Sequence, residues 1–157
     1  MKEKIVLLLL FFLPFAGSLM AQVPISILKN TDMNFGTMAA SSGGGAVVLS
    51  PYGSRIASGG IILPSLTGNV SAAQFTVTGE PGYTYAITLP ADFTLYESGV
   101  GPAFMVVNAF TRTPSATGTL TAGSQIVYVG ATLNVGASQV AGLYENTTGF
   151  AVIVNYN

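Results

Sequence analysis

The chain has 157 residues, of which 7% are charged and 50% are hydrophobic, and its formal net charge is −1. Nucleic acids and anionic membrane surfaces are bound by clustered Lys and Arg, so a chain with five scattered basic residues is not suited to either partner. Because histidine and cysteine are both absent from the sequence, Ser-His-Asp catalysis, Cys-His catalysis and the usual zinc sites are excluded.

Residues 1–21 have the three regions of a secretory signal peptide. A basic start is followed by an apolar block at residues 5–13 and by small residues that lead to Ala21. This block is shorter than the roughly 20 residues that span a bilayer, and Pro14 interrupts it, so a membrane anchor is the weaker interpretation. We therefore expect cleavage between Ala21 and Gln22, followed by export to the periplasm, the cell surface or the extracellular space.

The remaining residues, 22–157, are predicted to form a single domain, without a transmembrane anchor after cleavage. The first predicted strand covers residues 23–28, with Val23, Ile25 and Ile27 in alternation. A polar link follows, residues 33–35 alternate again, and residues 43–45 are three glycines that predict a flexible turn.

Three short strands are predicted next, at residues 46–49, 55–57 and 61–63. A turn sequence, Ser-Pro-Tyr-Gly, separates the first two, and Gly59-Gly60 separates the second from the third.

The clearest alternation predicts a pair of strands at residues 74–78 and 83–89. Phe75 and Val77 share one face of the first strand, and Tyr85, Ile87 and Leu89 share one face of the second. The intervening Gly-Glu-Pro-Gly has turn chemistry, so we expect the two strands to form a β-hairpin.

The last third of the chain also alternates. Strands are predicted at residues 103–110 and 125–129, and Gly130 is expected to end the second before residues 132–135 continue. A final strand at residues 149–157 carries its apolar side chains on one face: Phe150, Val152, Val154 and Tyr156.

No segment shows sustained helical periodicity, and the frequent glycines and β-branched residues disfavour long helices. Seven or more short strands in one domain predict an all-β fold, an immunoglobulin-like β-sandwich.

Several segments together resemble an uncharacterised family of secreted bacterial domains, the domain of unknown function 4402. The segments are spread over nearly all of the chain after residue 22: residues 33–36 (MNFG), 60–63 (GIIL), 72–79 (AAQFTVTG), 85–90 (YAITLP), 129–135 (VGATLNV), 142–144 (GLY) and 152–157 (VIVNYN). The resemblance implies a secreted domain and carries no activity with it.

The C-terminal strand also resembles that of spore-coat-U-type and chaperone-usher pilin subunits, because Tyr156 stands one residue before the end of an alternating apolar strand. In pilins a periplasmic chaperone recognises this strand, and an N-terminal extension completes the sandwich of the neighbouring subunit. The resemblance implies other copies of the chain or related subunits as partners, and a periplasmic chaperone as a further one. Residues 23–28 are then the candidate donor strand.

Chemistry beyond strand pairing has weak support. Asp92 and Glu97 lie close in sequence, and a glycosidase needs two acids close together in space. The simpler interpretation is that both are solvated acids beside a short strand. No acidic loop of calcium-binding type occurs, and the glycines at 43–45 lack the Gly-Lys-Ser/Thr of a phosphate loop, so we expect no cofactor or metal.

Two functions therefore remain open. The first is a non-enzymatic structural or adhesive surface subunit, of fimbrial type, that assembles by strand complementation. The second is a secreted carbohydrate- or ligand-binding module, because aromatic faces stack on sugars and the chain has several tyrosines in or between its predicted strands: Tyr52, Tyr83, Tyr85, Tyr96, Tyr128 and Tyr144.

Overall fold

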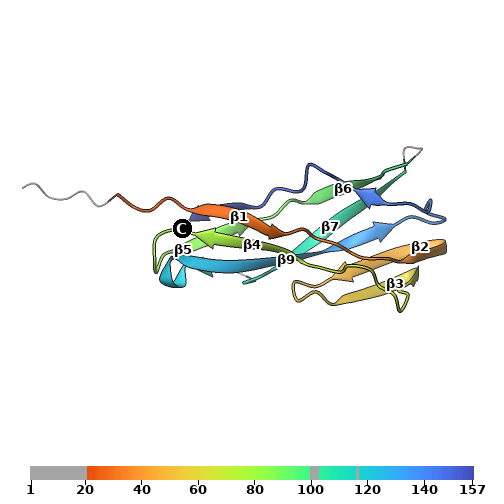
Figure 1. The fold of residues 1–157 in the computed structure, drawn as a ribbon, viewed down its shortest axis with the longest axis horizontal. Helices are drawn as coiled ribbons and strands as arrows, with labels where there is room; N and C mark the ends of the chain where they lie inside the picture. The colour runs from red at the N-terminus through yellow and green to blue at the C-terminus, as the bar shows by residue number, and fades with distance from the viewer. Residues whose placement is uncertain (1–20, 100–102, 116) are drawn as a thin grey trace, which may run out of the picture.

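The computed structural model describes residues 21–99, 103–115 and 117–157, so the predicted signal peptide lies outside the described residues except for Ala21. The described chain is all-β, as predicted (Figure 1). Its strands are β1 (Ser26–Thr31), β2 (Ala39–Leu49), β3 (Arg55–Ile62), β4 (Ala73–Thr78), β5 (Thr84–Thr88), β6 (Asp92–Glu97), β7 (Phe104–Thr113), β8 (Gly118–Thr119), β9 (Ser124–Val135), β10 (Tyr144–Glu145) and β11 (Ile153–Tyr156). A 3-10 turn covers Thr121–Gly123, and no helix among the described residues is long and apolar enough to cross a membrane.

The strands form two antiparallel sheets. The larger has eight strands in the order β1-β4-β9-β7-β6-β10, with β2 also paired to β9 and β3 to β2. The smaller has three strands in the order β11-β5-β8. One edge of β9 pairs with β4 up to Val129 and with β2 from Ala131 onward, so the large sheet forks and curls around this strand.

The buried side chains form two clusters. The first, here the enclosed core, takes residues from both sheets: Ala73, Phe75, Val77, Tyr85, Ile87, Leu120, Val127 and Val129. The second, here the open core, takes its strand residues from the large sheet alone: Phe35, Val47, Leu49, Ile61, Met105, Val107, Ala131, Leu133 and Val135. Among the described residues, the small sheet therefore covers only one half of the large sheet.

The predicted faces of the central strands are confirmed, but the predicted hairpin is wrong. Phe75 and Val77 of β4 are buried against Tyr85 and Ile87 of β5, as alternation indicated. The two strands belong to different sheets, however: β4 pairs with β1 and β9, and β5 pairs with β11 and β8. The apolar face of β4 packs against the apolar face of β5 across the core, so each strand covers the other. In a hairpin the two faces would lie in one sheet, and a further layer would be needed to cover both.

Three glycine sites predicted to interrupt strands lie inside them. Gly130 is within β9, Gly59-Gly60 within β3, and residues 43–45 within β2, where the ladder to β3 shifts register. At Gly130 a Cβ atom would lie 2.2 Å from the Leu49 carbonyl oxygen, and at Gly45 it would lie 2.1 Å from the Ser58 oxygen. These glycines are required by the close approach of a neighbouring backbone.

The two ends of the described chain lie in different sheets. β1 begins at Ser26 and pairs with β4, which places the candidate donor strand in the sheet of its own chain. At the C-terminus, Phe150, Val152, Val154 and Tyr156 all pack against the enclosed core, although only residues from Ile153 onward are paired, to β5.

Candidate functional site

A groove of about 890 Å³ with an apolar floor runs over the open core. Its walls are residues 32–40 on one side and residues 139–146 on the other. Its floor consists of inward-facing side chains of β6, β7 and β9: Phe93, Leu95, Met105, Val107, Leu133 and Val135. The core itself is thus the floor of the groove, because the small sheet does not extend over it.

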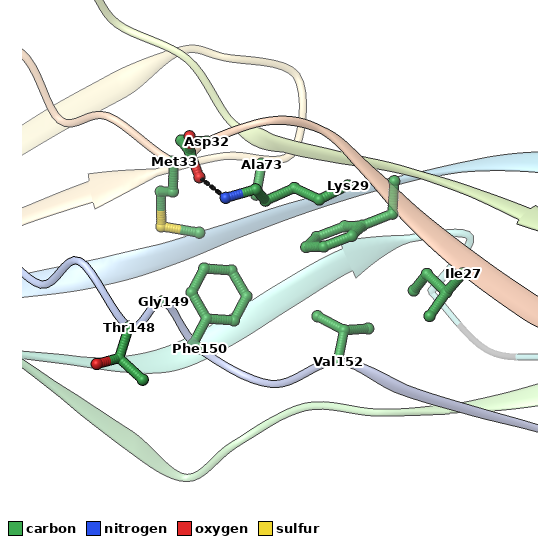
Figure 2. Close-up of a pocket in the computed structure, with 10 residues that line it drawn as sticks. Ile27, Lys29, Asp32, Met33, Ala73, Thr148, Gly149, Phe150 and Val152 are labelled. Carbon is green, nitrogen blue, oxygen red and sulfur yellow. Dashed lines mark hydrogen bonds and ion pairs between the residues drawn. The ribbon is translucent and has the colours of Figure 1, made fainter.

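A second hollow of about 280 Å³ continues the groove toward the enclosed core. It is bounded by β1 and by residues 148–152, and it shares Asp32, Met33, Gly149 and Phe150 with the first hollow. In Figure 2, Phe150 and Val152 project from the C-terminal segment toward Ile27 and Ala73. The two hollows therefore form one groove between residues 27–40 and residues 139–152.

Phe150 lies where the two hollows meet. Its ring packs edge-on against Phe75, with centroids 6.2 Å apart, and against Phe93, with centroids 5.8 Å apart. A tilted contact with Phe110 at 5.1 Å completes the cluster. Such aromatic contacts add to simple area burial, so Phe150 closes the floor at a point that the small sheet leaves open.

The first wall is an edge of the large sheet. β1 pairs with β4, and the ladder continues through the mutual backbone hydrogen bonds of Asn34 and Ser71 and through the Thr37 N–H bonded to the Thr67 oxygen at 2.7 Å. The guanidinium of Arg55 donates to the carbonyl oxygens of Phe35 and Thr37, which fixes the position of this wall.

The second wall is held by side chains. Between β10 and β11, residues 146–152 belong to no strand. The Tyr144 hydroxyl donates to the Val140 oxygen at 2.7 Å and accepts from Gln139 Nε2, also at 2.7 Å, and Asn146 Nδ2 donates to the Thr94 oxygen at 2.8 Å. Two chain segments with extended or irregular backbone therefore face each other across an apolar floor.

The charges near the groove are few. Lys29 and Asp32 form an ion pair on the first wall, and Glu145 on the second accepts a hydrogen bond from Ser98 Oγ at 2.8 Å. No cluster of three or more metal-ligating side chains occurs in the described ranges. The groove thus has an apolar floor between walls that carry polar side chains and backbone groups, with little fixed charge.

The predicted assembly residues of the two chain ends are brought together by the fold. Ile25 and Ile27 pack against the enclosed core beside Phe150, Val152, Val154 and Tyr156. Val23 is bound through its backbone: its N–H donates to Glu80 Oε2 at 3.0 Å, and its carbonyl oxygen accepts from the Tyr156 hydroxyl at 2.6 Å. Ala21 and Gln22, at the predicted cleavage point, are exposed.

The two acids considered as a catalytic pair are not neighbours. Asp92 and Glu97 are the first and last residues of β6, and five residue steps of a strand separate their backbones by about 17 Å. Glycosidase pairs lie roughly 5 to 9.5 Å apart. The fold therefore does not assemble this pair.

The tyrosines are dispersed over the molecule. Tyr85 is fully buried and donates to Gln125 Oε1 at 2.8 Å, whereas Tyr52, on the β2–β3 turn, is 85% exposed. One exposed aromatic pair was not predicted: Tyr96 of β6 lies directly opposite Phe104 of β7, and each is 57% exposed.

Sequence reasoning missed the groove because its second wall, residues 139–146, does not alternate. Residues 139–146 contain isolated apolar side chains, Val140 and Leu143, among glycine and polar residues, and both side chains are exposed. Val140 and Leu143 in a stretch with no strand or helix period are the sequence feature that points to this region.

Comparison with known proteins gives one match. A family model described as a domain of unknown function, DUF4402, matches residues 25–156, a range that includes both groove walls and every strand from β1 to β11. No curated protein and no solved structure matches the chain.

Proposed function

The chain belongs to the DUF4402 family, and we propose that it is an exported, non-enzymatic structural or adhesive subunit that binds an extended strand of a neighbouring subunit in its apolar groove. The groove over the open core is the observation that carries this proposal. Its floor is the inner face of a sheet, and its two walls are chain segments whose backbones run alongside it.

An inserted strand would satisfy both parts of the groove. Its backbone would add to the wall edges in the manner of β-augmentation, and every second side chain would point to the floor. Each large apolar side chain fully buried there contributes about 1.5 to 3 kcal/mol. Because association costs roughly 4 to 15 kcal/mol, the backbone hydrogen bonds to the wall edges must contribute to binding in addition to this burial.

The proposed architecture is an immunoglobulin-like, pilin-like sandwich in which the second sheet lacks a strand. In support of this, the small sheet of three strands packs on the enclosed core, while the strand residues of the open core come from the large sheet alone. A complete sandwich buries the inner faces of both sheets along their length. A strand donated by a neighbour would supply the missing cover.

The other parts of the proposal follow from the chain ends. The signal-peptide pattern at residues 1–21 supports export, and the C-terminal strand with Tyr156 supports handling by a periplasmic chaperone before assembly. The partners are other copies of the chain or related subunits. Residues 22–157 carry three basic and five acidic side chains, which gives no reason to invoke nucleic acid.

Hydrogen exchange tests the groove directly. Residues 22–157 would be followed by mass spectrometry over a concentration series, with light scattering on the same samples to report assembly. We expect amides of residues 146–152 to become protected as assemblies form, because an inserted strand would pair with them. Assembly without protection of this wall, or a monomer at all concentrations and with all candidate subunits, would reject strand insertion.

A second candidate function rests on the exposed Tyr96–Phe104 pair. Glu145 is paired opposite Tyr96 at this edge, so an aromatic surface lies beside a hydrogen-bonding carboxylate, an arrangement suited to sugars. A glycan array with residues 22–157 tests this function. Binding that is lost in Tyr96→Ala and retained in Tyr52→Ala would establish it, and an array without hits would eliminate it.

A further inference from the structure

A closed ring of three hydrogen bonds holds the start of the described chain against its end. The Val23 N–H donates to the carboxylate of Glu80 at 3.0 Å, the Glu80 N–H donates to the Tyr156 hydroxyl oxygen at 2.6 Å, and that hydroxyl donates to the Val23 carbonyl at 2.6 Å. The ring joins residues that are far apart in sequence and grips both backbone groups of Val23. Because the hydrogen bonds involve only the N–H and the carbonyl oxygen of Val23, the ring binds the backbone at this position and not the side chain.

The surroundings of the ring are built for this contact. A Cβ atom at position 79 would lie 2.2 Å from the Tyr156 hydroxyl, so Gly79 is needed for the tyrosine to reach the turn. The Tyr83 ring packs edge-on against the Tyr156 ring, with centroids 5.6 Å apart, which fixes the direction of the hydroxyl.

The segment that the ring holds, residues 21–31, is here called the arm. Beyond Val23 it is attached by the half-buried Ile25 and Ile27, by the ladder to β4, and by a 2.7 Å hydrogen bond between Ser26 Oγ and Thr78 Oγ1. The ladder shifts register between Lys29 and Thr31, and pairing resumes at Thr31 and Gln74, where the arm joins the rest of the chain. Release of the arm would therefore extend as far as this shift.

The arm is also part of the groove. Ile27 and Lys29 line the smaller hollow, and Asp32, just beyond the arm, lines both hollows. Lifting the arm would therefore widen the groove and expose the edge of β4. The position of the arm and the capacity of the groove are coupled by this shared wall.

Resting on the proposed function, we propose that the Val23–Glu80–Tyr156 ring is a latch on the arm, and that the neighbouring subunit is a second copy of this chain whose arm exchanges onto β4, at the first wall of the groove. Every contact described for the arm is made with the body of the same chain. A second copy has the same body, so an exchanged arm regains all of these contacts, and only the barrier to opening must be overcome. The latch sets that barrier.

Cysteine pairs test the exchange, because the chain has no cysteine of its own. Ser26→Cys and Thr78→Cys would be prepared as separate proteins, residues 22–157, mixed, and oxidised. Positions 26 and 78 lie opposite each other in the β1–β4 ladder, so a disulfide between the two proteins forms only if the arm of one lies on β4 of the other. Val48→Cys mixed with Ile56→Cys is the matched control, because these residues are opposite within the β2–β3 pair, away from the arm.

The latch is tested by removing one oxygen atom. Tyr156→Phe keeps the edge-on contact of its aromatic ring with Tyr83 but loses two of the three hydrogen bonds of the latch. Tyr83→Phe is the control, because the Tyr83 hydroxyl takes no part in these three hydrogen bonds. We expect Tyr156→Phe to speed disulfide formation between the mixed proteins about tenfold, and Tyr83→Phe to leave it unchanged. Trypsin cleavage after Lys29, which needs the arm to leave β4, should accelerate by the same factor.

The outcomes separate this inference from the function it rests on. If the 26/78 mixture forms no more mixed disulfide than the 48/56 control while residues 146–152 become protected on assembly, strand insertion stands and the second-copy arm is wrong. If the mixed disulfide forms but residues 146–152 stay unprotected, arm exchange stands and strand insertion in the groove is wrong. Equal rates for Tyr156→Phe and the parent protein, by both disulfide formation and cleavage, would reject the latch.

Discussion

The enclosed core and the open core lie on the same strand, β9, yet they are covered differently. Val127 and Val129 of β9 face the small sheet, whereas Leu133 and Val135 face the groove. The enclosed core lies between the large sheet and the small sheet. The open core is covered on its inner side by the wall segments, residues 32–40 and 139–146, and not by a second sheet. The difference teaches that the two halves are closed by different means: a second sheet covers the enclosed core, whereas wall segments cover the open core, whose floor residues Met105, Val107, Leu133 and Val135 are 2–9% exposed.

A substitution in each core tests whether stability is divided in this way. Leu120 is fully buried in the enclosed core, and Leu120→Ala should lower the free energy of unfolding by about 2 to 5 kcal/mol, since it leaves a cavity. Leu95, on the groove floor, is only partly buried, so Leu95→Ala should cost about 1 kcal/mol. Urea unfolding of both variants measures the two values, and equal losses would show that the two halves are equally closed.

Tyr85 tests the polar part of the enclosed core. Its hydroxyl donates to Gln125 Oε1, which also accepts from the Thr119 N–H at 2.9 Å. Tyr85→Phe removes one of these two bonds and keeps the buried ring, so we expect a loss of about 1 kcal/mol in the free energy of unfolding. Tyr96→Phe on the exposed surface is the control and should change this free energy little. A neutral Tyr85→Phe would mean that packing alone holds the strand.

The same tyrosine gives the enclosed core a dependence on pH. Burial raises the pKa of the Tyr85 hydroxyl above its ordinary value of 10.0, so the folded protein retains a proton that the unfolded chain releases first. This contribution to stability is fully present below about pH 10 and is lost as the pH rises through the folded-state pKa. Urea unfolding at a series of alkaline pH values should show a steeper decline for the parent protein than for Tyr85→Phe. Parallel declines would contradict burial of a neutral phenol.

A substitution at the rim of the groove is expected to change the free energy of unfolding least and the binding of an apolar ligand most. Val140 is 57% exposed and lines the groove, so Val140→Arg should alter the free energy of unfolding by no more than about 0.5 kcal/mol. Placing a charge over the apolar floor should nevertheless weaken binding of an uncharged apolar dye such as Nile red several-fold. Ile56→Arg, on an exposed face outside the groove, is the matched control. Equal dye binding by both variants would mean that the groove is not the apolar site.

Alternation in the sequence predicted which face of a strand is buried better than it predicted the partner of that strand. Phe75, Val77, Tyr85 and Ile87 all point inward as expected. Period two identifies the buried side chains, but a hairpin and a crossing between sheets bury the same ones. The decisive contacts are long-range: the Gly82 N–H donates to the Leu120 oxygen, and the Leu120 N–H donates to the Tyr83 oxygen.

Glycine was misleading for a related reason. A glycine permits a turn, and it also permits two backbones to approach closely, and the local sequence is the same in both cases. Gly130 is of the second kind, since the Leu49 carbonyl oxygen occupies the space of its absent side chain. The strand break predicted there becomes the point where β9 changes partner from β4 to β2.

The candidate site was predicted only at its ends. Alternation in the two terminal segments predicted that their apolar side chains are buried. In the structure these side chains do come together on the enclosed core: Ile25, Ile27, Phe150, Val152, Val154 and Tyr156. The groove between them depends on where the small sheet stops, and no local pattern encodes that. Residues 32–40 and 139–146 become its walls through tertiary contacts such as those of Arg55 and Tyr144.

The direction of the strands has a mechanical consequence. In Figure 1 the strands run along the long axis of the molecule, the arm leaves at one end, and β2 and β10 lie toward the other. A pull applied through an exchanged arm would then load the β1–β4 and β4–β9 ladders in shear, because antiparallel hydrogen bonds lie perpendicular to the strands. Bonds loaded in this way share the force and must fail together, so a fibre of such subunits would resist tension far better than a chain of domains that unzip one bond at a time.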